Sequence, residues 1–253
     1  MSDQDKHRAR IFLHRGDLAQ ARSAWESAVA DDRAAHDEQE LSNSLGNLGN
    51  TCALMNDFAS AEEHYREVLG IQRRGQNTHA IAHTLVNLGN LYVAADHPEQ
   101  SRAYYLEALD LLNALNDHRA LGILYNNLAL LQVRDLQWDQ AIASFNEALN
   151  CHRVVGNEEG LATTYSQMGK CFLDHDELTK AERCLNNASE HYIKLGSEPA
   201  EASVLRVLAV VYERRHDLVS ARRCLERVVS IDRHYHLPEY KADFHQLTAM
   251  SSH

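Results

Sequence analysis

Six asparagines recur at related places in this 253-residue chain. The set is Asn47, Asn50, Asn87, Asn90, Asn126 and Asn127. An amide side chain donates and accepts hydrogen bonds at once, so it can pair with both groups of a peptide bond. A row of amides therefore favours a surface that holds an extended peptide by its backbone. The alternative is that part of the set serves hydrogen bonds between neighbouring helices.

Four basic residues cluster in the second half of the chain: Arg134, Lys170, Arg206 and Arg214. Basic side chains attract carboxylates, and arginine engages them through two parallel hydrogen bonds where lysine does not. The cluster predicts a preference for acidic segments. The alternative is that these residues pair with local acids such as Asp174 and Glu213.

The 16 histidines raise the question of a metal. His79 and His83 are four residues apart and can share a helix face, and His234 and His236 form a short His-x-His. Neither pair has a third ligand at a telling spacing, so we predict no metal site. The sequence also lacks a glycine-rich phosphate loop, a nucleophile elbow and a His-Glu-x-x-His motif. We therefore expect a binding protein without a cofactor rather than an enzyme.

Charge and composition narrow the class further. The net charge of −11 disfavours nucleic acid as a partner. The N-terminal segment is polar and unlike a secretory signal, and no apolar run approaches membrane-spanning length, so we expect no membrane insertion. The five cysteines form no Cys-x-x-Cys pair, which favours reduced thiols in a cytoplasmic protein.

A period of about 40 residues, in the range of stacked-repeat proteins, positions these side chains. A small residue recurs at Ala21, Ala61, Ser101, Ala141, Ala181 and Ala221. A large one follows at Trp25, Tyr65, Tyr105, Phe145, Leu185 and Leu225. With units numbered from residues 2, 42, 82, 122, 162 and 202, apolar spacings of 3, 4 and 7 trace one helix face. Asp or Asn in the middle of the unit suits the N-cap of a second helix, so the chain is predicted to be all-α.

These units carry a large residue, Leu-Gly and an aromatic in the first helix, as in Leu45–Asn50 and Leu85–Tyr92, and a small, a large and a small residue in the second. The pattern resembles the tetratricopeptide repeat (TPR), in which the usual unit has about 34 residues. The longer unit is similar to the repeats of the LGN/Pins polarity adaptors, kinesin light chains and Rap-type regulators. The resemblance implies one right-handed α-solenoid over residues 1–253, with six helix–turn–helix units and a capping helix at about 239–250.

In TPR arrays the first helix of each unit lines a concave groove, and positions 2, 5, 6, 9, 12 and 13 of the unit point into it. Here those positions carry six basic and three acidic residues, whereas the rest of the chain has a net charge of −14. A positive groove in a negative shell steers and holds an acidic segment. Leu130 and other apolar residues of the same surface are expected to anchor ligand side chains.

We therefore predict a scaffold or adaptor that binds an extended or partly helical, acidic peptide of a partner protein, as a monomer or weak homo-oligomer. One alternative is a small-peptide sensor similar to the Rap-type regulators, although the repeats begin without an N-terminal effector segment. Another is a self-assembling array. Asp5 and Arg8 give the first helix a polar face, which argues against end-to-end stacking.

Overall fold

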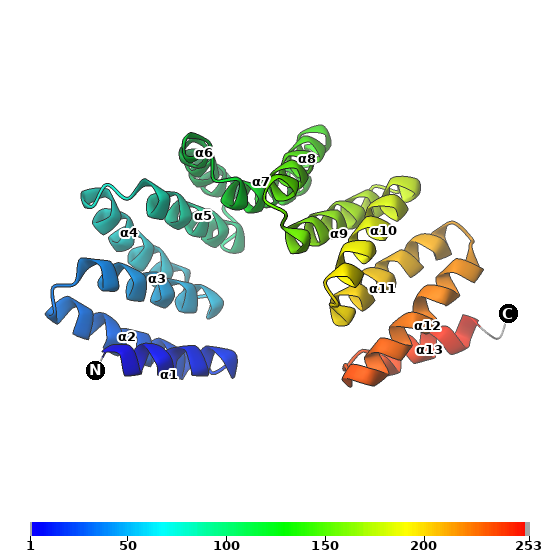
Figure 1. Ribbon diagram of the computed structural model, residues 1–253, viewed down its shortest axis with the longest axis horizontal. Helices are drawn as coiled ribbons and strands as arrows, with labels where there is room; N and C mark the ends of the chain where they lie inside the picture. The colour runs from blue at the N-terminus through cyan, green and yellow to red at the C-terminus, as the bar shows by residue number, and fades with distance from the viewer. Residues whose placement is uncertain (1, 251–253) are drawn as a thin grey trace. The chain divides into compact units, whose positions relative to one another are not determined.

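The computed structural model describes residues 2–250, and this part of the chain forms thirteen α-helices and no strand (Figure 1). The first six are α1 Ser2–His14, α2 Leu18–Ala34, α3 Glu38–Leu54, α4 Phe58–Arg74, α5 Thr78–Ala94 and α6 Pro98–Leu115. The others are α7 His118–Arg134, α8 Trp138–Val154, α9 Glu158–Asp174, α10 Leu178–Lys194, α11 Glu198–Arg214, α12 Leu218–Tyr235 and α13 Tyr240–Met250. The predicted all-α repeat fold is confirmed.

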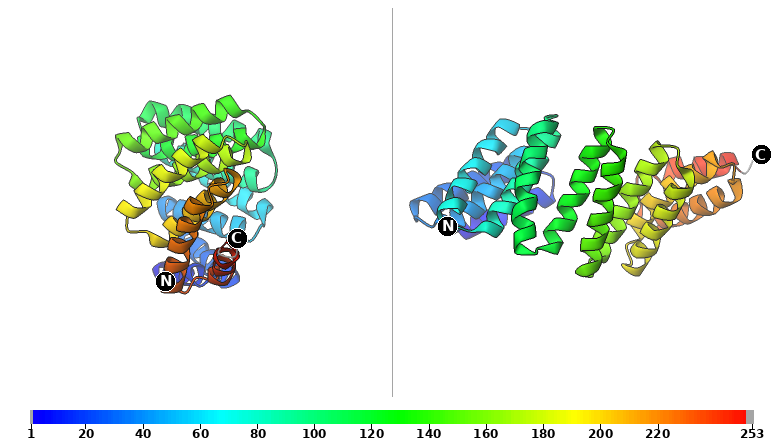
Figure 2. Two further views of the ribbon diagram at one scale, coloured as in Figure 1. Left: turned by 90° about the vertical axis from the view of Figure 1, so that its right-hand side faces the viewer. Right: turned by 90° about the horizontal axis from the view of Figure 1, so that it is seen from above.

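The chain divides into two compact units between Ala120 and Leu121, here called the N-terminal unit and the C-terminal unit. In the N-terminal unit, each helix from α1 to α6 packs against the next, and these helices lie side by side in Figure 2, from blue to green. In the C-terminal unit, the helices from α8 to α13 pack in the same sequential way. The prediction of one continuous solenoid is not tested by this division and stays a prediction.

Small residues in the first helices let the helix pairs approach closely. A Cβ atom at Gly89 would lie 2.2 Å from the ring of Tyr105, and one at Gly49 would lie 2.9 Å from the ring of Tyr65. Both tyrosines are almost fully buried. Since protein interiors are close-packed, these two positions accept only glycine while the ring keeps its place. The glycine of the Leu-Gly pattern is thus a packing requirement in these two repeats.

The turns between helices follow one rule. The residue before each helix-capping residue has a left-handed backbone, for example Asn56 with φ 60° and Gly156 with φ 64°. The capping carboxylates of Asp17, Asp57 and Asp217 then accept the N–H of the residue three positions later, as the sequence predicts. These turns are short, so consecutive helices run back along each other.

All five cysteines are free and buried, which fits the predicted reduced thiols. Burial raises the pKa of Cys171, Cys184 and Cys224 to about 11. A thiol with so high a pKa is a poor nucleophile at neutral pH, so these residues belong to the packing. None of the helices between residues 2 and 250 is both long enough and apolar enough to cross a lipid bilayer.

Candidate peptide-binding surfaces

A pocket of about 400 Å³ lies in the N-terminal unit, between the first helices α1, α3 and α5 and the second helices α2 and α4. Most of its lining side chains are polar. Its amides and cations are Asn43, Asn47, Asn50, Gln72, Asn87, Lys6 and Arg10. Three of the six asparagines singled out in the sequence therefore meet in one pocket, with two cations at the same place.

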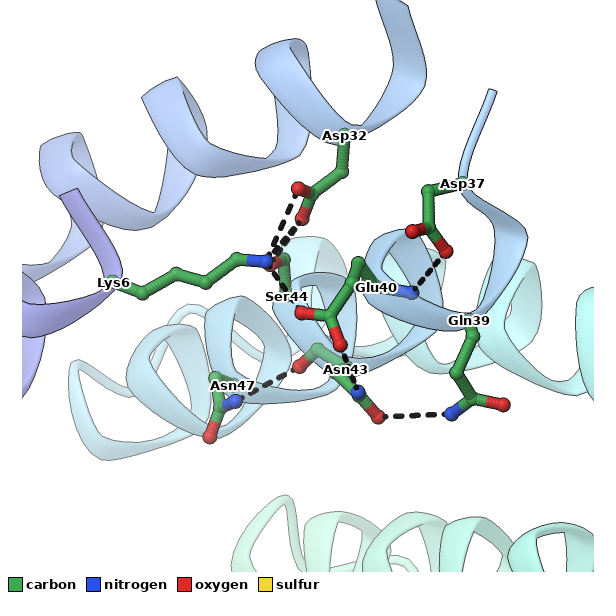
Figure 3. A network of polar contacts seen from close by, with 8 residues as sticks. All are labelled: Lys6, Asp32, Asp37, Gln39, Glu40, Asn43, Ser44 and Asn47. Atoms are coloured by element: carbon green, nitrogen blue, oxygen red, sulfur yellow. Dashed lines mark hydrogen bonds and ion pairs between the residues drawn. The ribbon is translucent and has the colours of Figure 1, made fainter. Parts of the chain in front are cut away.

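Lys6 does not offer its charge to this pocket, because two carboxylates already surround it (Figure 3). Its Nζ lies 3.0 Å from Asp32 Oδ2 and 2.6 Å from Glu40 Oε2, and Ser44 Oγ donates to Asp32 at 2.6 Å. Burial opposes the charge of Lys6, but the hydrogen bonds to Glu40 and Asp32 outweigh it and raise its pKa above the usual value. This cluster joins α1, α2 and α3 and fixes one wall of the pocket.

The same cluster orients two asparagines on α3. Asn43 donates to Glu40 at 3.3 Å, and Gln39 donates to the side-chain oxygen of Asn43 at 3.3 Å (Figure 3). Asn47 donates to the backbone oxygen of Asn43 at 2.9 Å. The side-chain oxygen of Asn47 makes no hydrogen bond within residues 2–250. It is held in place by its own amide nitrogen and is available to a ligand donor.

Asn50 and Asn90 have a structural task as well. Tyr65 donates its hydroxyl to the side-chain oxygen of Asn50 at 2.5 Å, and Tyr105 does the same to Asn90 at 2.5 Å. Burial raises the pKa of Tyr65 to about 12, so its hydroxyl stays protonated and needs an acceptor. The side-chain oxygens of these two asparagines therefore serve hydrogen bonds between neighbouring helices, which was the alternative to ligand binding. Asn50 is exposed and lines the pocket, and its amide nitrogen makes no hydrogen bond within residues 2–250.

Asn87 is the most available of the predicted amides. It is half-buried, lines the pocket from α5 and makes no hydrogen bond to another residue of the described part of the chain. Both its donor and its acceptor are therefore open to a ligand backbone.

The predicted amides of the C-terminal unit differ. Asn126 is 8% exposed, and its side-chain oxygen is buried without a hydrogen bond within the described chain. Such a buried side chain is out of reach of a ligand backbone, so Asn126 is left out of the proposed surface. Asn127, the next residue on α7, is half-buried, and Leu130 one turn on is 37% exposed.

The four predicted cations also separate by environment. Arg206 donates to Asp232 at 2.5 Å and to Asp243 at 2.8 Å, so two buried carboxylates already neutralise it. Arg214 donates to the backbone oxygen of Leu173 at 3.1 Å. Lys170 is exposed and forms no ion pair with the residues that the structure describes, and Arg134 is exposed. Arg206 is a link between α11, α12 and α13, because its partners come from those helices.

Asn43 and Arg10 also line the pocket; the repeat pattern places both on the predicted groove surface, although neither was among the predicted binding residues. Arg10 holds the same repeat position in the first unit as Asn50 and Asn90 hold in the two units that follow, and it is exposed at the pocket. The period itself was therefore the signal that could have added Arg10 to the site.

Antiparallel helix pairs that recur at a fixed period and stack in sequence define a helical-repeat protein. Its family is settled by a direct match. The tetratricopeptide repeat family matches residues 5–74, 80–154 and 160–234, and the chain belongs to that family. No curated protein matches the sequence.

Solved structures share the fold. BtubC (BKLC) of P. vanneervenii is 22% identical, with a TM-score of 0.78 over 87% of this chain and 92% of that one. RapI in its apo form is 12% identical, with a TM-score of 0.67 over 92% and 83% of the two chains. TPR-like repeats from P. anserina, named after kinesin light chain, are 16% identical, with a TM-score of 0.62 over 75% and 93%. The predicted resemblance to kinesin light chain and Rap-type arrays is confirmed as a likeness of fold.

Proposed function

We propose that this TPR protein is an interaction scaffold that binds an extended peptide segment of a partner protein on its N-terminal unit. The observation that carries the proposal is the polar pocket of about 400 Å³ in which Asn47, Asn50 and Asn87 meet. Its volume lies in the range of ligand sites, about 300–1,000 Å³. The unengaged oxygen of Asn47 and the whole amide of Asn87 match the N–H and C=O groups of a peptide backbone.

The proposed preference for acidic segments rests on cations that no close carboxylate neutralises. Arg10 lies at the pocket of the N-terminal unit and, within residues 2–250, forms no ion pair. On the C-terminal unit, Lys170 is exposed and likewise forms no ion pair with the described residues. Arg214 is left out, because its guanidinium lies 3.9 Å from the carboxylate of Asp176. Exposed cations attract acidic segments and speed their association. Arg206 is not part of this preference.

The amide contacts are tested with an array of short peptides of varied charge, followed by fluorescence anisotropy with the peptides that are retained. Asn87→Ala removes both an acceptor and a donor, so we expect affinity to fall by about tenfold, or about 1.4 kcal/mol. Asn113→Ala is the matched control, because Asn113 is exposed on α6 outside the pocket. Equal affinities of the two variants, or an array that retains no peptide, would overturn the proposal.

The charge preference is tested by Arg10→Glu on α1, with Arg15→Glu in the turn after α1 as the control. Both residues are exposed and both changes invert one charge, but only Arg10 lines the pocket. We expect Arg10→Glu to weaken acidic peptides more than neutral ones at low salt, and the difference to shrink at high salt because exposed charges are screened. The same loss in both variants would mean that only the net charge matters.

A further inference from the structure

Three metal-ligating side chains meet at one junction of the N-terminal unit. His79 and His83 lie one turn apart on α5, and Asp117 precedes α7. Asp117 Oδ2 lies 2.8 Å from His79 Nε2 and 3.9 Å from His83 Nε2. The ligand atoms of the three residues lie within 4.8 Å of one another. The structure therefore supplies the third ligand that the sequence spacing did not reveal.

The helix repeat explains why these residues converge. Side chains four apart on a helix share a face, which places both imidazoles on one side of α5. The residue that caps the first helix of the following unit comes up beside them. Asp117 caps with one oxygen only, since Oδ1 accepts the N–H of Ala120 at 3.0 Å. Its other oxygen, Oδ2, faces the two histidines.

The junction one repeat earlier has the same three positions, but different residues occupy them. The equivalent positions there hold Gln39, Asn43 and Asn77, a set without a carboxylate or an imidazole. Asn77 nevertheless performs the same capping, because its side-chain oxygen accepts the N–H of Ala80 at 3.1 Å. The fold therefore does not require histidine or aspartate at these three positions. The two imidazoles and the carboxylate are therefore specific to the junction of His79, His83 and Asp117 and are not a general feature of the repeat.

We propose that His79, His83 and Asp117 bind a divalent transition-metal ion of the Zn²⁺ class. Two imidazoles and one carboxylate are the donors of catalytic-type zinc sites, and they leave a position for water or for a ligand from a partner. Bonds of about 2.0 Å place tetrahedral ligands about 3.3 Å apart. The 2.8 Å and 3.9 Å separations lie on either side of that value. The imidazoles of His79 and His83 are 58% and 51% exposed, so they have room to adjust.

Bound metal joins the first turns of α5 to the start of α7 within the N-terminal unit. A ligand that binds only the folded chain raises its stability in proportion to the logarithm of its concentration over its dissociation constant, once that ratio is large. A plain hydrogen bond between His79 and Asp117 is the competing explanation of the geometry, and it makes no use of His83.

The experiment titrates Zn²⁺ into the tag-free full chain against a chromophoric chelator, and repeats the titration with Co²⁺ to read its d–d absorption. The key variant, His79→Gln/His83→Asn/Asp117→Asn, copies the preceding junction. It keeps the cap, as Asn77 and Asn157 show at the same place in other repeats. Asp117→Asn and His83→Asn test the ligands singly. His234→Gln/His236→Asn removes an exposed histidine pair elsewhere and is the control.

We expect one tight Zn²⁺ per chain in the wild type and in the control, and its loss in the triple variant. Each single change should weaken the site by at least about tenfold, the low end of what even an outer-sphere partner contributes. Zn²⁺ uptake that is equal in the wild type and the triple variant, or absent in both, would overturn the site. Unchanged affinity in Asp117→Asn or in His83→Asn would overturn the three-ligand assignment. Circular dichroism of every variant checks that the helices are retained.

Discussion

Each unit holds a cation between two carboxylates at the same repeat position, but the surroundings differ. Lys6 lies between Asp32, whose side chain is 5% exposed, and Glu40, which is 44% exposed. Arg206, at the equivalent place in the last full repeat, lies between Asp232 at 0% and Asp243 at 9% exposure. One partner of Lys6 is therefore hydrated, whereas both partners of Arg206 are out of water. A basic residue on a first helix can thus belong to the packing, and a charge count along the sequence overstates the charge open to a ligand.

A second difference concerns the large residue of each second helix. In the N-terminal unit Tyr65 and Tyr105 donate to Asn50 and Asn90. The equivalent pairs of the C-terminal unit are Phe145 with Leu130, Leu185 with Lys170, and Leu225 with Val210. At the first-helix position of Asn50 and Asn90, asparagine occurs only in the repeats whose large second-helix residue is a tyrosine. The amide-rich part of the chain therefore owes some of its amides to its tyrosines.

The first prediction breaks the ion cluster of the C-terminal unit. Arg206→Met leaves Asp232 and Asp243 buried without a cation, so we expect a loss of about 3–5 kcal/mol in the free energy of unfolding, the range for breaking a buried pair. Lys6→Met should cost less, because Glu40 is hydrated and Asp32 keeps the hydrogen bond from Ser44. Urea unfolding followed by circular dichroism measures both. Equal losses would remove the contrast between the two clusters.

The stability loss in Arg206→Met should depend on pH, and the pKa of Asp232 sets the direction of that dependence. Burial and neighbouring Asp243 raise the pKa of Asp232 even with Arg206 present. A carboxyl group whose pKa is higher in the folded chain than its unfolded value of about 3.9 favours folding at low pH, and that contribution is lost as the pH rises through the folded-state pKa. The loss in Arg206→Met should therefore be largest near neutral pH and shrink as the pH falls toward 4. Arg206→Met/Asp232→Asn should show a weaker pH dependence.

The second prediction transplants half of a hydroxyl–amide pair. Phe145→Tyr adds a hydroxyl at a residue that is 1% exposed, opposite Leu130 rather than an asparagine. A buried donor without a partner costs about 1–3 kcal/mol. Adding Leu130→Asn supplies the acceptor that Asn50 supplies to Tyr65, so the double variant should regain most of the loss. Thermal and urea unfolding of the four chains form a double-mutant cycle. A cycle without coupling would contradict the pairing of the two positions.

The sequence was sufficient for some of these features. The repeat period located the helices, their capping aspartates and the small buried residues, because packing repeats whenever the helices repeat. The sequence also indicates the pairing of Asn50 with Tyr65, because asparagine and tyrosine occur at these two positions in the same repeats. Charge clusters were not readable, since Lys6, Asp32 and Glu40 come from three helices. The same holds for His79, His83 and Asp117, because the third ligand belongs to the next repeat.

The third prediction is the reverse change, the removal of a hydroxyl from the N-terminal unit. Tyr65→Phe leaves the side-chain oxygen of Asn50 without its donor, but Asn50 is exposed and water can replace the hydroxyl. We expect a loss of about 0.5–1.5 kcal/mol, the net value of one hydrogen bond. Tyr65→Phe/Asn50→Leu then copies the pair of the C-terminal unit. Unfolding by urea gives both values, and a loss in Tyr65→Phe larger than that in Phe145→Tyr would reverse the expected order.

The last prediction compares two turns. Leu136 has φ 60° and is 77% exposed, whereas Asn56 has the same φ at the equivalent place of an earlier repeat. A left-handed backbone crowds the Cβ of a leucine, and asparagine tolerates it better. Leu136→Asn should therefore stabilise the chain by about 1 kcal/mol or less, and Asn56→Leu should destabilise it by a similar amount. Thermal unfolding measures the two shifts, which must be opposite in sign. If both variants lose stability, the exposed Leu136 side chain has a contact whose value exceeds the backbone strain.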